Sequence, residues 1–348
     1  MISWFAFLML LFGMSWAAVG LFRMYAIDQG MLDEPSARSS HLAPTPRGGG
    51  VVFFFGWIAL FAVLYWFGII THTYAALFLP AVAMGLLGFW DDHRSLSASI
   101  RLFIQCLAAV VALCLLQEGG DLIQDWLPFF LPLPICFMVL VVGIVWVINL
   151  FNFMDGSDGI AATEAIFVFT VGGYLAFQLN AIELGVLAWG LAAILAGFLA
   201  WNWPTARIFM GDSGSYFLGT MVTIYALISY KFFAMPLMLW VLLTALFWFD
   251  ATITLLRRLL AGEEWRKPHR SHAYQRLIQY GWSHQKVLLG TIVVNTILSG
   301  LTVMAFFEPR LMPFAFAFAM LLLTCLYILV EVAKPMFKKW HKVKPSQE

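Results

Sequence analysis

The chain has 348 residues, of which 62% are hydrophobic and only 11% are charged, and its formal net charge is +1. Soluble domains usually carry about 25% charged residues, so the composition excludes a protein that is built to dissolve in water. The small net charge gives no reason to expect a nucleic-acid partner, and a lipid bilayer is the expected surrounding.

Apolar stretches of membrane-spanning length recur from end to end, which predicts an all-α, polytopic integral membrane protein with about eleven transmembrane helices. We expect one membrane-embedded domain over residues 1–348, because the spans leave no room for a separate soluble domain. The first span has no basic residue before its apolar run, which favours a retained helix over a cleaved signal peptide. The predicted spans are 1–22, 51–68, 74–90, 99–116, 128–148, 160–178, 182–201, 215–230, 234–256, 286–306 and 311–332.

The basic residues predict the orientation, since cytoplasmic loops carry an excess of Lys and Arg. With the N-terminus in the periplasm, all of the 20 Lys and Arg residues except Lys231 and Arg310 lie on the cytoplasmic side, together with the C-terminus. Nearly all other polar residues fall on that side as well. The expected cytoplasmic loops are at about 23–50, 91–98, 149–159, 202–214 and 257–285.

The first of these loops reads DEPSARSSHLAPTPRGGG from Asp33 to Gly50. Prolines stiffen it, and its three glycines allow the backbone to approach a ligand or a helix closely. Guanidinium groups match phosphate oxygens, so the loop suits an anionic group. An ordinary basic cytoplasmic loop is the alternative. The candidate substrate-binding residues are Arg38, His41, Thr45 and Arg47.

The second loop starts with Asp91 and Asp92, which end the motif GFWDD. Adjacent carboxylates at a membrane boundary repel each other unless a cation or a proton compensates them. Such a pair suits Mg²⁺ binding or a general base, and we take both residues as catalytic candidates. Solvation by interfacial water is the alternative.

The third motif, NLFNFMDGSDG, lies between two spans and must turn, which its two Asp-Gly steps allow. Its amides and carboxylates exceed what a turn needs. If Asp158 is the N-cap of the helix at 160–178, Asp155 and Asp158 face the same pocket. The candidate substrate-binding residues are Asn149, Asn152, Asp155 and Asp158.

The fourth motif, FMGDSGS, lies between two spans at 209–215. Its glycines and serines suit a phosphate at a helix N-terminus, with Asp212 as a metal ligand that bridges to phosphate oxygens. The pattern is not that of a Walker A loop, and a simple helix cap is the alternative.

The fifth motif contains His269 and His272, whose spacing resembles that of metal ligands. Because the neighbouring residues are cationic and no cysteine or carboxylate is close in sequence, we expect an anion site for a diphosphate that includes Arg270. His284 is interpreted as an interfacial residue. Acids, bases and glycines gathered on one side are typical of a site where carboxylate-held Mg²⁺ stabilises a transferring phosphoryl group.

In this order, the five motifs resemble those of the polyprenyl-phosphate N-acetylhexosamine-1-phosphate transferases, bacterial glycosyltransferase family 4. The resemblance extends from Asp33 to about Arg276. It implies transfer of a sugar 1-phosphate from a UDP-N-acetylhexosamine to undecaprenyl phosphate, with release of UMP, at the cytoplasmic face of the inner membrane. It also implies Mg²⁺ or Mn²⁺ as cofactor and is compatible with a homodimer.

The resemblance implies roles for individual residues. Asp212 would bind the metal, and Asp155 would contact it together with the nucleotide sugar. The pair Asp91 and Asp92 would serve the lipid phosphate, with Asp91 as the base. The resemblance assigns the nucleotide sugar to Asn152 and Asp158, and the diphosphate or the sugar to His269, Arg270 and His272. We expect a single displacement; a covalent aspartyl-phosphate is the competing route.

Two features bear on the branch of the family. The histidines are interrupted as His-Arg-Ser-His, and the first loop contains PTPRGGG. Both look more like the branch that initiates O-antigen and other surface glycans, in lipopolysaccharide and cell-wall biosynthesis, than like the phospho-MurNAc-pentapeptide transferases. The candidate donors are GlcNAc, FucNAc, QuiNAc and a bacillosamine relative, and we favour a 6-deoxy sugar. A transporter of polar lipids or solutes, which would hold its acids near the bilayer midplane, is the rival from another class.

Overall fold

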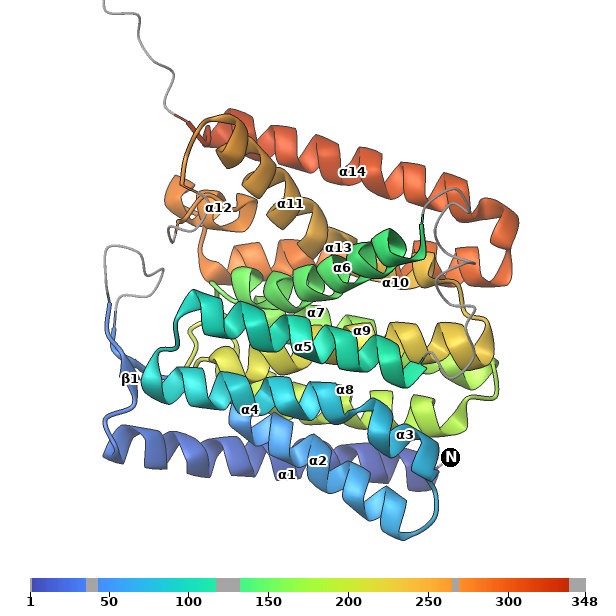
Figure 1. The fold of residues 1–348 in the computed structure, drawn as a ribbon. Helices are drawn as coiled ribbons and strands as arrows, with labels where there is room; N and C mark the ends of the chain where they lie inside the picture. Colours follow the sequence, from blue (N-terminus) through green and yellow to red (C-terminus); the bar gives the residue numbers. More distant parts are fainter. Residues whose placement is uncertain (1, 36–42, 117–131, 265–268, 338–348) are drawn as a thin grey trace, which may run out of the picture.

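The computed structural model describes residues 2–35, 43–116, 132–264 and 269–337 and shows a bundle of roughly parallel helices with almost no strands (Figure 1). Two strands of two residues each, β1 (Leu32–Asp33) and β2 (Thr45–Pro46), form a short antiparallel pair. The helices are α1 (Ile2–Asp28), α2 (Gly50–Trp66), α3 (His72–Leu77), α4 (Leu79–Arg94), α5 (Ala98–Leu116), α6 (Leu133–Met154), α7 (Ile160–Gln178), α8 (Ile182–Asn202), α9 (Asp212–Phe233), α10 (Leu237–Leu243), α11 (Ala245–Leu260), α12 (Ala273–Tyr280), α13 (His284–Phe307) and α14 (Met312–Ala333), with a 3-10 turn η1 (Pro309–Leu311) before the last.

The chain is a multi-pass membrane protein. Among the described residues, nine helices are long and apolar enough to cross a membrane, and the bent pair α10–α11 makes a tenth. Helix α2 is apolar but has only 17 residues. The outer helices expose large apolar side chains, such as Phe5, Phe103 and Leu321, which suits faces that contact lipid tails.

Helix α9 lies at the centre of the bundle, where every residue from Ser213 to Ser229 is buried. It packs against α2, α4 and α6, and glycines make two of these contacts close. A Cβ atom on Gly88 of α4 would collide with the main chain of Asp212, and one on Gly50 of α2 would collide with that of Gly214. Glycine at these positions therefore brings both helices against the first turn of α9.

Some predicted boundaries are wrong. The span predicted at 128–148 belongs to α6, which continues to Met154, so the third motif begins inside a helix rather than in a loop. The span predicted at 234–256 is two helices, α10 and α11, which meet at an angle of 75°. The loop predicted at 257–285 contains the helix α12.

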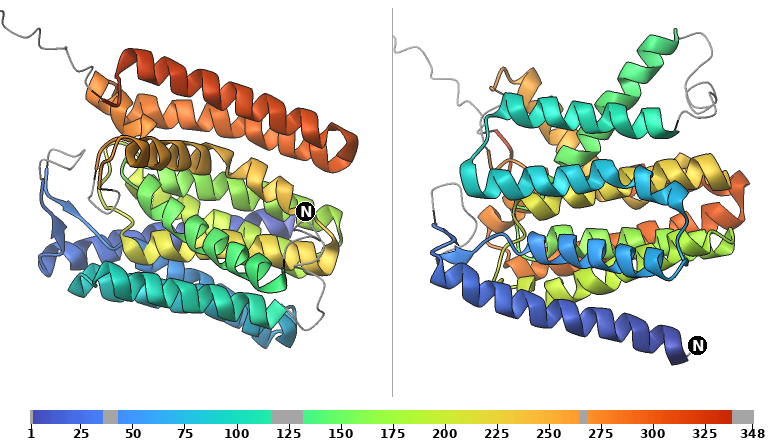
Figure 2. Two further views of the ribbon diagram at one scale, coloured as in Figure 1. Left: turned by 45° about the horizontal axis from the view of Figure 1, so that its top comes forward. Right: turned by 60° about the horizontal axis from the view of Figure 1, so that its bottom comes forward.

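The polar motifs meet at one end of the bundle, which we call the polar end. Strand β1, the C-terminal end of α4 and the helix α12 lie there, on the left in Figure 1, opposite the N-terminus. Two further views show the same arrangement (Figure 2). Motifs that are distant in sequence thus share one end of the fold.

Candidate active site

Asp212 and Asn152 form the centre of the site. Asp212 is the first residue of α9, and Asn152 lies in the last turn of α6. The Asn152 side-chain amide donates to Asp212 Oδ1 at 2.6 Å and to Ser215 Oγ at 3.2 Å. The structure therefore brings the third and fourth motifs together through side chains.

Asp92 holds the start of α9 from the neighbouring helix. Its Oδ1 accepts from the Asp212 N–H at 2.9 Å and its Oδ2 accepts from the Ser213 N–H at 3.1 Å. Carboxylates are favoured at helix N-termini, where backbone N–H groups lack partners. Arg47 donates to the main-chain oxygen of Asp92 at 3.0 Å. The first two amides of α9, where the sequence suggests a substrate phosphate, are thus bound to Asp92.

Asp91 has different partners from its neighbour. Its Oδ1 accepts from the Leu96 N–H at 2.7 Å, while its Oδ2 accepts from Arg101 at 3.2 Å and from the Tyr216 hydroxyl at 3.3 Å. Arg101, which the motifs do not include, also interacts electrostatically with Asp212. The adjacent aspartates are therefore compensated separately, Asp91 by a guanidinium and Asp92 by backbone amides.

Asp155 follows α6 and lies half-buried among other acids. Burial, followed by the carboxylates of Asp212, Asp92 and Asp158, raises the pKa of Asp155 well above its usual value. Acids from three motifs therefore lie close enough to interact electrostatically. A cation at this point would relieve their repulsion.

Asp158 is not the N-cap of α7, which corrects the prediction from its spacing. That position is Gly159, and no side chain caps the helix there. Asp158 instead lies 3.3 Å from His284 Nδ1 through Oδ1, and its Oδ2 accepts from the Ala206 N–H at 3.0 Å. The residue ties the third motif to α13 and to the segment before α9, and His284 is part of this contact.

Asn149 faces α5 rather than the acids. Its amide donates to Gln105 Oε1 at 2.8 Å, and Gln105 donates back at 3.4 Å. Gln105 is buried, so this pair satisfies two amides between membrane helices. The structure therefore supplies a packing role for Asn149.

The first loop is described only in part. Arg38 and His41 lie outside the described residues. Thr45 is buried in β2, and its hydroxyl donates to the Ala43 carbonyl at 3.0 Å. Arg47 is exposed and reaches the site through Asp92.

The histidine segment contacts the third motif through α12. The Tyr274 hydroxyl donates to the Phe153 carbonyl at 3.0 Å, and a Cβ atom on Gly156 would collide with that hydroxyl. Burial, followed by Asp250 and Asp155, raises the pKa of the Tyr274 phenol, which keeps it a donor. The ring of His272 lies 6.5 Å from that of Phe153. The fifth motif is thus placed next to the residues that follow Asn152.

Within the segment, His272 precedes α12, and its N–H donates to Gln275 Oε1 at 3.3 Å. His269 and His272 have ring centroids 5.0 Å apart. Burial, followed by His272 and Arg258, lowers the pKa of His269 to about 4, so it is neutral near pH 7. Arg270 is partly buried in the same segment.

The donor set suits a hard divalent cation. The atoms of Asp212, Asp155 and Asn152 that could serve as metal ligands are all oxygens. Within the described ranges, no three His, Cys, Asp or Glu side chains form a group that could hold a metal alone. Mg²⁺ commonly takes one or two carboxylates and completes its shell with water and substrate phosphates, so the residues present fit it.

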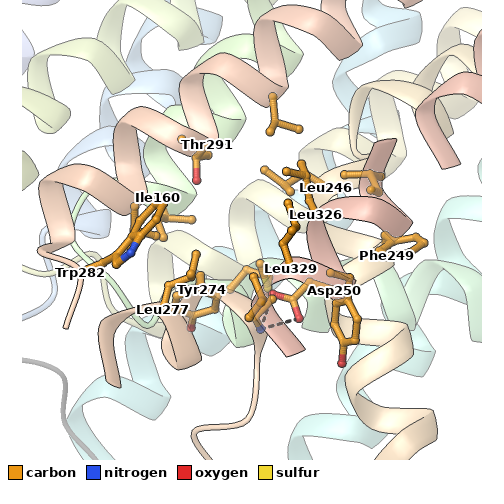
Figure 3. Close-up of a pocket in the computed structure, with 18 of the residues that line it drawn as sticks. Ile160, Leu246, Phe249, Asp250, Tyr274, Leu277, Trp282, Thr291, Leu326 and Leu329 are labelled. Carbon is orange, nitrogen blue, oxygen red and sulfur yellow. Dashed lines mark hydrogen bonds between the residues drawn. The ribbon is translucent and has the colours of Figure 1, made fainter. Parts of the chain in front are cut away.

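An apolar cavity of about 500 Å³ opens beside the histidine segment, between α11, α13 and α14. Leu246, Leu326 and Leu329 are among the residues that line it. Asp250 and Tyr274 also line the cavity, near the start of α12, as Figure 3 shows. The cavity suits an apolar chain.

The chain has recognisable relatives. The model of glycosyl transferase family 4 matches residues 74–230. The chain is 30% identical over 281 residues, 79% of its length and 77% of the relative's, to a Bacillus subtilis (strain 168) protein named probable undecaprenyl-phosphate N-acetylglucosaminyl 1-phosphate transferase. It is 29% identical over 342 residues, 84% of its length and 80% of the relative's, to the decaprenyl-phosphate N-acetylglucosaminephosphotransferase of Mycobacterium tuberculosis (strain CDC 1551 / Oshkosh). It is 25% identical over 231 residues, 62% of its length and 69% of the relative's, to the phospho-N-acetylmuramoyl-pentapeptide-transferase of Streptococcus pneumoniae serotype 19F (strain G54).

Proposed function

Because the chain belongs to the polyprenyl-phosphate N-acetylhexosamine-1-phosphate transferases of glycosyl transferase family 4, we propose that it transfers an N-acetylhexosamine 1-phosphate from a UDP-sugar to undecaprenyl phosphate and releases UMP. The observation that carries this proposal is the convergence of Asp212, at the start of α9, with Asn152 and Asp155, at the end of α6, at the polar end. Phosphoryl transfer depends mainly on positioning and on charge stabilisation, and this cluster suits both.

In our proposal the cluster holds Mg²⁺ or Mn²⁺ through Asp212 and Asp155. Bound there, the ion would neutralise charge on the diphosphate as UMP leaves. Asn152 supports the arrangement, since its hydrogen bond fixes the rotation of the Asp212 carboxylate. Asp92 supports it from the other side by fixing the first turn of α9.

The reaction proposed is a single displacement. An oxygen of the lipid phosphate attacks the phosphorus that carries the sugar, and the bond to the UMP oxygen breaks. Asp91 accepts the remaining proton of the lipid phosphate, while Arg101 and Tyr216 orient its carboxylate. The positive charge of Arg101 also attracts the lipid phosphate to this part of the site.

The apolar cavity between α11, α13 and α14 supports the choice of a lipid acceptor. In our proposal it takes part of the undecaprenyl chain, because its lining is mostly apolar. We further propose that the polar end faces the cytoplasm of a bacterial inner membrane, where soluble UDP-sugars are available. The predicted distribution of Lys and Arg supports this orientation.

The donor and the pathway are also proposals. We propose a role in starting O-antigen or a related surface glycan, because the interrupted histidines and the PTPRGGG loop resemble that branch, and among its donors we favour a 6-deoxy N-acetylhexosamine. Two of the relatives above carry N-acetylglucosamine in their names, which makes UDP-GlcNAc the first donor to test beside the 6-deoxy sugars.

The test uses purified protein, undecaprenyl phosphate, Mg²⁺ and a panel of radiolabelled UDP-sugars that includes UDP-MurNAc-pentapeptide. We expect labelled lipid in the organic phase and an equal amount of UMP with one N-acetylhexosamine donor. Transfer from the pentapeptide donor alone would place the chain in the other branch. Absence of lipid product with every donor would refute the proposal, and UMP exchange without lipid would replace the single displacement by a covalent route.

A further inference from the structure

A buried carboxylate outside the five motifs lies against the histidine segment. Asp250 of α11 is 5% exposed, and both of its side-chain oxygens accept from the Ala273 N–H at 2.9 Å. Thr254 donates to Oδ1 from one turn along the same helix at 3.0 Å. Figure 3 shows Asp250 beside Tyr274 at the apolar cavity, with the hydrogen bonds from the Ala273 N–H dashed. An acid this deep in an apolar helix needs such partners.

His272 is the residue immediately before that amide and is itself 4% exposed. Its Nδ1 has two neighbours that compete for it. Asp250 Oδ1 lies 3.6 Å away, beyond hydrogen-bond length, and favours a proton on Nδ1, whereas the main-chain N–H of Gln275 faces the ring in a capping box and favours a bare Nδ1. A contact with a charged carboxylate is the stronger of the two, so the proton belongs on Nδ1.

We propose that Asp250 is a positioning residue that holds the His272 ring with Nδ1 protonated, so that Nε2 binds a phosphate oxygen of the UDP-sugar. This inference rests on the proposed function. With Asp250 at Nδ1 and a diphosphate at Nε2, the ring lies between two anions and donates through Nε2. His269, whose ring lies beside that of His272, is neutral near pH 7 and leaves this role to His272.

A short chain of contacts links α12 to Asp212, where we propose that the diphosphate binds. Tyr274 connects α12 to the carbonyl of Phe153, and the residue before Phe153 is Asn152, which binds Asp212. The same contact stacks the His272 ring near Phe153. A diphosphate held at Asp212 therefore lies on the side of the site where the histidine segment docks.

A purely structural role for Asp250, as a cap for α12, makes a different prediction. Asp250→Asn keeps an oxygen that can accept from Ala273 and Thr254 but removes the charge that faces His272 Nδ1. If Asp250 only capped α12, Asp250→Asn would lower the thermal stability of the protein and leave substrate binding unchanged. If Asp250 positions His272, Asp250→Asn would weaken binding of the UDP-sugar in the same way as loss of the His272 ring.

The kinetic test compares Asp250→Asn, His272→Gln and their double variant in the folded full-length protein. We expect each single variant to raise KM for the UDP-sugar about tenfold, the effect of losing a hydrogen bond to a charged group, with a smaller change in KM for the lipid phosphate. The double variant should be no worse than His272→Gln, and Asp250→Glu should recover part of the loss. Thr254→Val, which removes a donor from the same carboxylate, should keep the wild-type KM. Additive effects in the double variant, or an unchanged KM in Asp250→Asn, would overturn the proposal.

A second measurement does not depend on turnover. Nitrogen NMR of histidine-labelled protein, with the His272 signals assigned by their loss in His272→Gln, reports which ring nitrogen carries the proton. We expect Nδ1 to be protonated in the wild type and bare in Asp250→Asn, where the Gln275 amide then donates to it. Identical His272 signals in the wild type and Asp250→Asn would contradict the inference. A wild-type protein that shows the Nδ1 proton but transfers no sugar would refute the proposed function and leave standing only the contact by which Asp250 holds the His272 ring.

Discussion

The side-chain amide of Asn152 donates to Asp212 Oδ1 at 2.6 Å, although the two residues belong to helices that are separate in sequence. The same amide reaches Ser215 Oγ, so it is directed by two acceptors on the first turn of α9. One oxygen of the Asp212 carboxylate is therefore fixed, which fixes the direction of the other. The metal ion that we propose there would depend on Asn152 as well as on the acids.

Substitution of Asp212 by Asn should remove activity and leave the fold intact. The change keeps the volume and the hydrogen-bonding shape but removes the charge that would hold Mg²⁺. We expect a loss of about a thousandfold or more in kcat, because several kcal/mol of charge stabilisation depend on the ion. Sugar-phosphate transfer into extractable lipid measures this effect, and membrane expression and thermal stability serve as controls. Turnover near that of the wild type would refute the metal assignment.

Asn152→Ala should weaken metal binding rather than abolish turnover. Without its donor, Asp212 can rotate, and the loss of such a supporting hydrogen bond typically costs about 10- to 100-fold in metal affinity. The Mg²⁺ concentration needed for half-maximal transfer should rise by that factor, with activity recovered at saturation. Asn149→Ala, one turn earlier in α6, is the matched control, since Asn149 binds Gln105 and should leave the Mg²⁺ dependence unchanged. The same Mg²⁺ dependence in both variants would contradict this assignment.

Gly88→Ala should destabilise the protein. The added methyl group would meet the backbone of Asp212, which cannot rotate out of the way. Overpacking of this kind usually costs about 1–3 kcal/mol, so we expect lower thermal stability in detergent and weaker transfer. Gly143→Ala in α6 is the control, because a Cβ atom there would meet no atom of the described chain within 4 Å. Equal stability of the two variants would show that α4 and α9 are not packed as described.

His269 should make the protein more sensitive to acid. Its pKa is about 4 in the fold, whereas an unfolded histidine titrates near about 6.5. Its contribution to stability is therefore complete above about pH 6.5 and is lost as the pH falls toward about 4, because the unfolded chain binds the proton first. Thermal unfolding of the wild type and His269→Gln between about pH 7 and about pH 4 measures the difference. The wild type should lose more stability than the variant, and parallel curves would contradict the burial of the imidazole.

The sequence predicts the meeting of Asp155 and Asp212, because both follow or precede apolar spans on the same predicted side. It does not predict that Asp91 and Asp92 have different partners. That division depends on how α4 is rotated against α9, which the contact at Gly88 determines. For Asp158, spacing suggests a helix cap, and the actual partners come from α13 and from a loop distant in sequence.

Asp250 and Arg101 show a second limit. Both lie within predicted spans, which are identified by their apolar residues. A charged residue in such a span is itself a signal for function. Asp250 could have been found by that rule. Its partner could not, because the Ala273 amide begins α12, a helix in a stretch that the sequence predicts as a loop.

The way α4 is attached to α9 has a consequence for redesign of the enzyme. Asp92 binds two backbone amides and Gly88 rests on backbone, so this boundary tolerates little variation in side chains. Helix α12, in contrast, is held in place by hydrogen bonds of side chains such as Tyr274 and Asp250. Libraries aimed at new sugar donors should therefore vary α12 and leave the α4–α9 contact unchanged.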